Sequence, residues 1–165
     1  MGEKTVVVRL DGKMRFEAET GSGHLVAMDN AAGDTAPRPA ELILVALGGC
    51  TGMDVISILR KKRQDVLDYA IRVRSVQRDE HPQAFSSFEV VHEVTGRDLD
   101  AEAIRRAIEL SATRYCTVST TLAGGDIEIR HRYAILAADD PAAAPITGEV
   151  MVTGPHRPIA EPATA

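Results

Sequence analysis

Short stretches rich in β-branched or alternating residues open the chain and predict three strands. Residues 4–10 contain three consecutive valines, residues 13–19 alternate apolar with charged side chains, and residues 24–28 are mostly apolar. An Asp-Gly pair and a Gly-Ser-Gly sequence separate these stretches, and such sequences form tight turns between strands. We therefore expect three short strands before residue 29.

Residues 39–62 predict one long central helix. Pro39 suits the first helical turn, and Glu41 complements the positive end of the helix dipole. Because the first half of the segment is apolar on all sides, we expect it to be buried all round. One sheet covers a single side, so a second subunit is expected to cover the other. Gly48 and Gly52 share one face and predict a close approach of another backbone there.

The second half of the chain predicts a hairpin, a helix and a last strand. Alternating residues at 69–79 and 85–95 flank a His-Pro-Gln turn. Asp100 is a suitable N-cap for an amphipathic helix that runs to about Tyr115, and a short turn separates this helix from a strand at 126–135. The order β-β-β-α-β-β-α-β predicts an α+β fold with antiparallel sheets.

The composition changes from residue 137 onward. Five of the eight prolines lie between residues 141 and 162, among many alanines and without a period. This composition is typical of disordered segments. We therefore expect one domain at 1–136 and a C-terminal tail at 137–165.

Charge and hydropathy narrow the classes of function. With a formal net charge of −5, the chain has no general attraction for nucleic acid or anionic lipid, so we expect neither as a partner. It has no uninterrupted apolar run of about eighteen residues, so we expect no membrane span. Its first residues lead directly into a strand without an apolar signal region, which indicates a cytoplasmic protein. Thiols stay reduced in that compartment, so a cysteine pair there suggests catalysis or sensing.

Cys50 and Cys116 are the residues most suited to chemistry. Cys50 follows two glycines that leave its sulfur uncrowded, and Cys116 ends the second helix, where a loop can bring a second thiol inward. In a peroxide-reducing pair, one thiolate becomes a sulfenic acid and a second thiol condenses with it to a disulfide. Inert packing is the competing interpretation, because buried free cysteines usually behave as small apolar residues. Asp54 shares a helical face with Cys50, and we expect a structural role for it, since a carboxylate opposes thiolate formation.

No pattern in the sequence indicates a metal or a cofactor. The five histidines show no ligand spacing with one another or with the cysteines. Neither a glycine-rich phosphate loop nor a nucleophile-elbow sequence is present. We therefore expect a protein that works without metal or cofactor.

In these segments the chain resembles the OsmC/Ohr family of osmotically inducible and organic hydroperoxide resistance proteins, and within it the YhfA-like branch. The resemblance covers about residues 4–136. The segments that carry it are Pro39-Ala40-Glu41-Leu42, Ala46-Leu47-Gly48-Gly49-Cys50, the stretch from Asp54 to Val66, and Cys116-Thr117-Val118-Ser119.

The resemblance implies an intertwined homodimer in which antiparallel sheets wrap long central helices, with active sites at the subunit interface. It implies thiol-dependent reduction of organic hydroperoxides in oxidative-stress defence, with Cys50 peroxidatic and Cys116 resolving. It also implies that a dithiol or a lipoyl-type reductant regenerates the pair.

The chain departs from the family pattern in the charges around the reactive thiol. Peroxidatic members carry a glutamate directly after the helix-opening proline, where this chain has Ala40, and Glu41 follows one position later. About 14 Å of helix axis separates Glu41 from Cys50, so Glu41 can act only across the dimer. No arginine lies between His24 and Pro37, where this branch would supply one. The alternative is a non-catalytic binder of small ligands, or a redox sensor, on the same scaffold.

Overall fold

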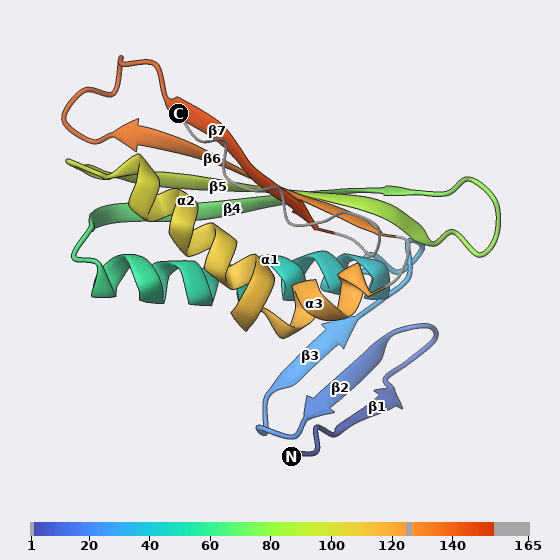
Figure 1. The fold of residues 1–165 in the computed structure, drawn as a ribbon. Helices are drawn as coiled ribbons and strands as arrows, with labels where there is room; N and C mark the ends of the chain where they lie inside the picture. Colours follow the sequence, from blue (N-terminus) through green and yellow to red (C-terminus); the bar gives the residue numbers. More distant parts are fainter. Residues whose placement is uncertain (1, 125–126, 154–165) are drawn as a thin grey trace. The chain divides into compact units, whose positions relative to one another are not determined.

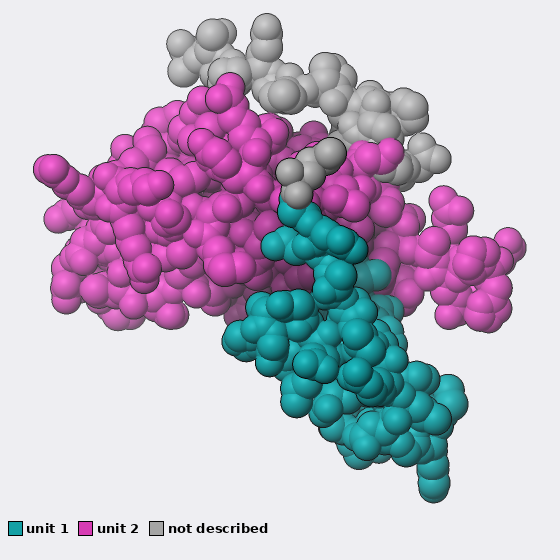
Figure 2. All heavy atoms as spheres, turned by 90° about the horizontal axis from the view of Figure 1, so that it is seen from below, with its two compact units in different colours: residues 1–43 teal, residues 44–165 magenta. Residues whose placement is uncertain are grey.

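The computed structural model describes residues 2–124 and 127–153, and the chain divides into two compact units (Figure 2). The first unit comprises residues 1–43, and the second comprises residues 44–165. Helix α1, Pro39–Lys61, continues through this division. Its bounds confirm the helix predicted at 39–62.

The first unit contains a three-stranded antiparallel sheet in the order β1-β2-β3. Its turns use Gly12 and Gly23 at φ of 91° and 83°, a region that favours a residue without a Cβ atom. Of the described residues in this unit, only Ala18 and Asp29 are buried, so the sheet has almost no core of its own. The three predicted strands are confirmed as β1 Val6–Leu10, β2 Phe16–Thr20 and β3 Leu25–Met28.

The second unit contains a four-stranded sheet in the order β4-β5-β6-β7 (Figure 1). The first two strands form the predicted hairpin, but β5 and β6 are parallel, which corrects the prediction of purely antiparallel sheets. The reason is the connection: the chain crosses over through three helical segments between them, and a crossover returns a strand in the same direction. The strands are β4 Asp65–Gln77, β5 Phe85–Arg97, β6 Glu128–Ala137 and β7 Ile146–Thr153.

Strand β7 corrects the prediction of a disordered tail that begins at residue 137. It pairs antiparallel with β6, where Met151 lies opposite His131 and is buried. Residues 146–153 contain neither alanine nor proline and are rich in β-branched side chains, so this stretch favours a strand although the tail around it does not. The prediction is wrong for residues 146–153, and the part of the tail at 154–165 lies outside the described residues.

The helix predicted from residue 100 to about residue 115 is divided in two. Asp100 caps α2, Ala101–Leu110, by accepting a hydrogen bond from the Glu102 N–H at 2.9 Å, as predicted. The chain then widens into a π-helical turn, η1, Ser111–Tyr115, where the Cys116 N–H donates to the carbonyl of Ser111 at 2.9 Å. Helix α3, Thr117–Ala123, follows where only a short turn was expected.

The helices of the second unit lie on one face of its sheet, and the core lies between them (Figure 1). The buried side chains of α1 recur every fourth position, as expected for one face of a helix. They pack with α2 and with inward-facing residues of β5 and β6. One core cluster comprises Val55, Leu59, Val94, Ile104, Ala107, Ile108 and Ile135, and a second comprises Leu47, Phe88, Val90 and Ile129.

Two glycines of α1 make room for side chains of β4. A Cβ atom at Gly48 would lie 3.1 Å from Cγ2 of Val73, and one at Gly52 would lie 2.8 Å from Cδ1 of Ile71. The close approach predicted at these glycines is therefore to side chains of the sheet within the same chain, and not to another backbone. Their cost in helix propensity is offset by the closer packing of α1 on the sheet.

The opposite face of α1 is not covered by the described residues of the chain. Val45 and Met53 are 65% and 69% exposed, and a Cβ atom at Gly49 between them would have no neighbour within 4 Å. The expected burial on all sides is therefore not complete within one chain. By length and composition alone α1 could cross a membrane. Its packing against the sheet is that of a core helix with one free face.

Candidate functional site

The structure brings the two sequence-predicted cysteines together. The sulfur atoms of Cys50 and Cys116 and a carboxylate oxygen of Asp54 all lie within 4.8 Å of one another. Both cysteines are free thiols. Since a disulfide needs sulfur atoms about 2.05 Å apart, a movement on the scale of a side chain would join them.

Cys116 is positioned by the break between η1 and α3. Its backbone is extended, with φ of −72° and ψ of 101°, and it serves as the N-cap of α3. The Ser119 N–H donates to its sulfur at 3.2 Å, in the place where a serine or threonine oxygen would usually accept. The side chain of Cys116 is fully buried, whereas that of Cys50 is partly exposed.

Thr51 joins α1 to this capping turn, and sequence reasoning missed it. Its hydroxyl donates to the carbonyl of Leu47 at 2.8 Å and lies 3.5 Å from the sulfur of Cys116. The side chain is fully buried, so these contacts satisfy a polar group that would otherwise be costly to bury. Its position directly after Cys50 was the only signal that the sequence offered.

Asp54 is held by a residue of the π-helical turn. The Ser111 hydroxyl donates to its carboxylate at 3.0 Å, and Ser111 is fully buried. This contact fits the structural role predicted for Asp54. The proximity of the same carboxylate to both sulfurs goes further, because it gives the thiols an acidic neighbour.

The surroundings of Cys116 favour the protonated thiol. Burial raises the pKa of the Cys116 thiol above its ordinary value. The contact with Thr51 opposes this rise, the neighbouring Cys50 adds to it, and the Ser119 N–H opposes it. None of these causes is a neighbouring cation.

A cavity of about 300 Å³ opens beside Asp54. It lies between the second half of α1 and the end of α2 with its following turn. Its lining combines apolar side chains with one basic residue and one acidic residue, a mixture that suits a small organic molecule. The lining residues are Asp54, Ser57, Ile58, Lys61, Leu110 and Tyr115.

Glu41, the third sequence-predicted site residue, lies in the first turn of α1. Its carboxylate accepts a hydrogen bond from the Arg38 N–H at 2.8 Å and pairs with the Arg38 guanidinium at 3.4 Å. An acidic residue that bonds back to the start of its own helix is a capping arrangement. Glu41 is not a member of the cluster that contains the two sulfurs.

A buried polar array in the second unit was also missed by sequence reasoning. His92 of β5 and His131 of β6 are fully buried with ring centroids 6.1 Å apart, and the Tyr69 hydroxyl lies 2.7 Å from Nδ1 of His92. Burial lowers the pKa of His92 to about 3 and that of His131 to about 4, so both rings are neutral near pH 7. Nε2 of His92 and both ring nitrogens of His131 have no hydrogen-bond partner within the described chain. The signal was available, because His92 stands in an inward position between two valines.

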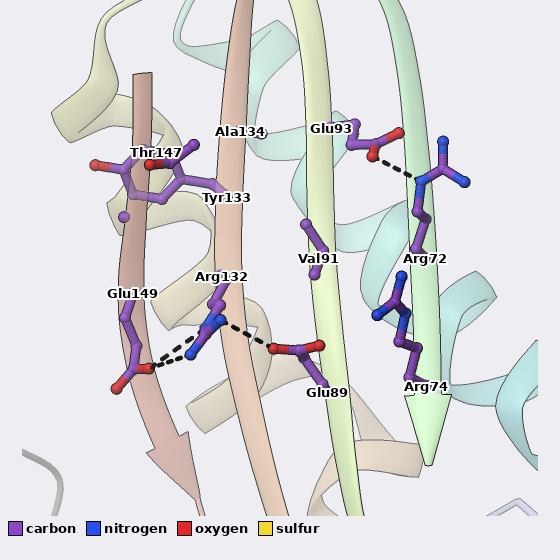
Figure 3. Close-up of a pocket in the computed structure, with 11 residues that line it drawn as sticks. Arg72, Arg74, Glu89, Val91, Glu93, Arg132, Tyr133, Ala134, Thr147 and Glu149 are labelled. Carbon is purple, nitrogen blue, oxygen red and sulfur yellow. Dashed lines mark hydrogen bonds and ion pairs between the residues drawn. The ribbon is translucent and has the colours of Figure 1, made fainter. Parts of the chain in front are cut away.

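A larger hollow of about 660 Å³ lies on the sheet face away from the helices (Figure 3). Arg132 pairs there with Glu89 at 3.1 Å and with Glu149 at 3.5 Å, and Arg72 pairs with Glu93 at 2.7 Å. These largely exposed pairs contribute little to stability and neutralise one another. The hollow holds neither cysteine, so we assign the chemistry to the thiol cluster instead.

Comparison with known proteins gives the family. The model of OsmC-like proteins matches residues 32–132. The chain is 44% identical over 125 residues to the protein YhfA of Escherichia coli K12, which covers 76% of this chain and 92% of YhfA. Two solved structures share the fold. An OsmC-like protein from Mycoplasma pneumoniae matches with a TM-score of 0.71 at 13% identity, over 81% of this chain and 97% of the other. The organic hydroperoxide resistance protein OhrB of Bacillus subtilis matches with a TM-score of 0.55 at 19% identity, over 80% and 98%.

These matches confirm the resemblance inferred from the helix and cysteine segments, and they confirm the α+β fold class. The structural likenesses at 13% and 19% identity concern the fold alone. By its sequence and its fold, the chain belongs to the OsmC-like protein family.

Proposed function

We propose that the chain is a thiol-dependent peroxidase that reduces organic hydroperoxides in oxidative-stress defence. The observation that carries the proposal is the proximity of two free thiols, Cys50 and Cys116, within 4.8 Å. Family membership supports it, because the OsmC-like fold is shared with a protein named for organic hydroperoxide resistance.

The proposed cycle uses the two cysteines in turn. The Cys50 thiolate attacks an oxygen of the hydroperoxide, the O–O bond breaks, and the alcohol leaves after taking up a proton. Cys50 is thereby oxidised by two electrons to a sulfenic acid. The Cys116 thiol then attacks this sulfur, water leaves, and a disulfide forms. A dithiol or a lipoyl-type reductant returns two electrons and two protons to the disulfide, so the cycle needs no cofactor.

The division of roles follows from exposure. Cys50 is partly exposed, and an attacking thiol must be reached by the substrate. Cys116 is fully buried and is held at the cap of α3, which suits a resolving thiol that meets only the oxidised Cys50. The partly apolar cavity beside Asp54 offers room for the organic group of the substrate.

We further propose that the protein is a cytoplasmic homodimer. The uncovered face of α1, formed by Val45, Gly49 and Met53, is apolar and narrow, as a helix–helix contact requires. The first unit, in which Ala18 and Asp29 alone among the described residues are buried, also needs a covering surface. In such a dimer Glu41 would act on the thiol site across the interface. We propose neither nucleic acid nor membrane as a partner.

The substitution Val45→Glu tests the dimer. It is expected to weaken subunit association by at least about 10-fold, because an unpaired charge buried in an interface costs several kcal/mol. Size-exclusion chromatography with light scattering over a range of concentrations gives the dissociation constant. Val76→Glu is the matched control, since Val76 is similarly exposed at 60% but lies on β4. A monomeric parent protein, or equal association of both variants, would contradict the dimer.

The first oxidation cycle tests the thiol roles without a reductant. One equivalent of cumene hydroperoxide is expected to convert the reduced protein to a Cys50–Cys116 disulfide, mapped by peptide mass spectrometry. In Cys116→Ser the same addition should leave a sulfenic acid on Cys50 that dimedone traps. Because the pKa of Cys116 is raised, the resolving step should accelerate as the pH rises past the ordinary thiol value of about 8.5. A dimedone adduct on Cys116 in Cys50→Ser, together with no adduct on Cys50 in Cys116→Ser, would reverse the roles.

The second candidate function is a small-ligand binder or redox sensor. One observation favours it: burial is the largest influence on the pKa of Cys116 and raises it, which opposes thiolate formation. It predicts slow stoichiometric oxidation without turnover, and a lipophilic molecule that co-purifies with the protein. Multiple turnovers with a dithiol would exclude it.

A further inference from the structure

The cluster of Cys50, Cys116 and Asp54 also has the composition of a metal site. We propose that the reduced protein binds one thiophilic divalent cation, of which Zn²⁺ is the model, through the two thiolates and the Asp54 carboxylate. The inference stands apart from the peroxidase proposal, because it needs no substrate and no turnover.

The distances suit a small ion. The three ligand atoms lie within 4.8 Å of one another. In a tetrahedral zinc site, with Zn–S bonds of about 2.3 Å, two sulfur ligands stand about 3.8 Å apart. A small side-chain adjustment therefore closes the cluster around an ion. Three protein ligands leave a fourth position for water, and the cavity of about 300 Å³ beside Asp54 provides solvent on that side.

The ligand set is anionic once it binds an ion. Two cysteine sulfurs and an aspartate oxygen lie within 4.8 Å of one another, and each binds metal in its deprotonated form. Like charges so close together oppose ionisation unless a cation joins them. A divalent ion bound by the three ligands supplies positive charge directly.

The ligands have the outer contacts that a metal site needs. The Ser111 hydroxyl holds the Asp54 carboxylate at 3.0 Å, and the Ser119 N–H holds the Cys116 sulfur at 3.2 Å. Such contacts orient ligands before the ion arrives. The hydroxyl of Ser119, the residue whose N–H holds that sulfur, is buried without a hydrogen-bond partner in the described chain.

The ligand types select the ion. Two soft thiolates with one carboxylate favour Zn²⁺ or Cd²⁺ over Mg²⁺ and Ca²⁺, which prefer oxygen ligands throughout. Binding to the fully protonated pair replaces both S–H protons and releases them, while the oxidation states of metal and sulfur stay unchanged. The sequence analysis expected no metal because it searched for histidine spacing. This proposal revises that expectation, since its ligands come from α1 and from a distant helix cap.

Cobalt binding tests the site on the reduced, chelator-treated full chain. Titration with Co²⁺ is expected to give one ion per subunit, a thiolate-to-cobalt charge-transfer band, and the visible absorption of tetrahedral Co²⁺. Zn²⁺ should displace the cobalt stoichiometrically. In weakly buffered solution near pH 7, Zn²⁺ should release at least one proton per subunit, and it should protect both cysteines from alkylation.

Variants separate this site from adventitious binding. Cys50→Ser and Cys116→Ser should lose most of the charge-transfer absorption. Asp54→Asn keeps both thiols and should weaken Zn²⁺ binding at least about 10-fold, and Ser111→Ala should weaken it by about 10-fold through loss of an outer contact. Asp68→Asn, at an exposed position of β4, is the matched control and should bind as the parent does. Octahedral cobalt spectra, or equal Zn²⁺ binding by the double cysteine variant, would overturn the inference. That result would leave the peroxidase proposal intact, because peroxide turnover can be measured with a chelator present and needs no metal.

Discussion

Replacing Cys50 by serine is expected to lower the turnover of cumene hydroperoxide with a dithiol reductant by at least about 10³-fold, the scale on which loss of a nucleophile acts in other enzymes. A serine hydroxyl stays protonated near neutral pH, whereas the thiolate is the species that attacks peroxide. The change is nearly isosteric at a partly exposed position, so the fold should persist. Peroxide consumption measures the loss, and thermal unfolding verifies the fold.

Cys116→Ser is the matched variant for this experiment, because it removes the second thiol and leaves the first. Without reductant it should consume one equivalent of hydroperoxide per subunit and then stop. Alkylated parent protein gives the background rate. Equal turnover by Cys50→Ser and the parent would remove the peroxidase proposal, although the proximity of the two sulfurs would still require an explanation.

Acidification is expected to destabilise the protein well before its carboxylates become protonated. His92 and His131 have pKa values of about 3 and 4 in the folded chain, against an ordinary value of about 6.5 when unfolded. Above pH 6.5 both states hold neutral rings, so stability does not change there. As the pH falls below 6.5, the unfolded chain takes up two protons that the folded chain excludes. The free energy of unfolding should therefore fall by about 2 to 3 kcal/mol per pH unit down to about pH 4.

Denaturant unfolding at a series of pH values measures this slope. His131→Leu should reduce it by about half, since one of the two titrating groups is gone. It should also be tolerated at neutral pH, because both nitrogens of the His131 ring lack a partner within the described chain. His92→Asn keeps a polar atom near Tyr69 and should act similarly on the slope.

A control variant and a pH window separate the effect of the buried histidines from that of other titrating groups. His24→Gln, at an exposed position, should leave the slope unchanged. Carboxylates with a lowered pKa, such as Asp29, which Thr35 holds by a hydrogen bond, add a loss only below about pH 4. The window from pH 6.5 to about 4.5 therefore isolates the histidines. A flat stability curve in that window would mean that the buried rings are reached by water or already protonated.

The local sequence pattern was sufficient to predict most of the helices and strands. The apolar run with Pro39 at one end and a basic cluster at the other predicted α1, and Asp100 predicted the start of α2. These signals are reliable because the unpaired backbone N–H and C=O groups at helix ends find hydrogen-bond partners among residues nearby in the sequence. The two cysteines were also identified, from their local settings and from the family resemblance. The partners of the site were not. Thr51 and Ser111 contact atoms of Cys116 and Asp54, which lie 65 and 57 positions away in the chain.

Other predictions failed where a distant partner decided the outcome. Strand β7 pairs with β6 although the tail on either side of it is rich in alanine and proline. Strands β5 and β6 are parallel because helical segments connect them. The π-helical turn Ser111–Tyr115 depends on packing that a helical pattern does not contain. The buried histidine pair arises because two strands far apart in sequence lie side by side.

By itself, the sequence determined the chemistry that is available and the elements that carry it. These are two thiols, a carboxylate one turn from the first, and a helix that is too apolar to be covered by a single sheet. Periodicity and capping are local, so the chain encodes them within a few residues. Only the tertiary structure decided that the second thiol caps α3 beside the first, with Asp54 between Ser111 and the sulfurs. That arrangement depends on the path of the helical crossover between β5 and β6. The packing of the whole second unit determines this path, and no short stretch of sequence encodes it.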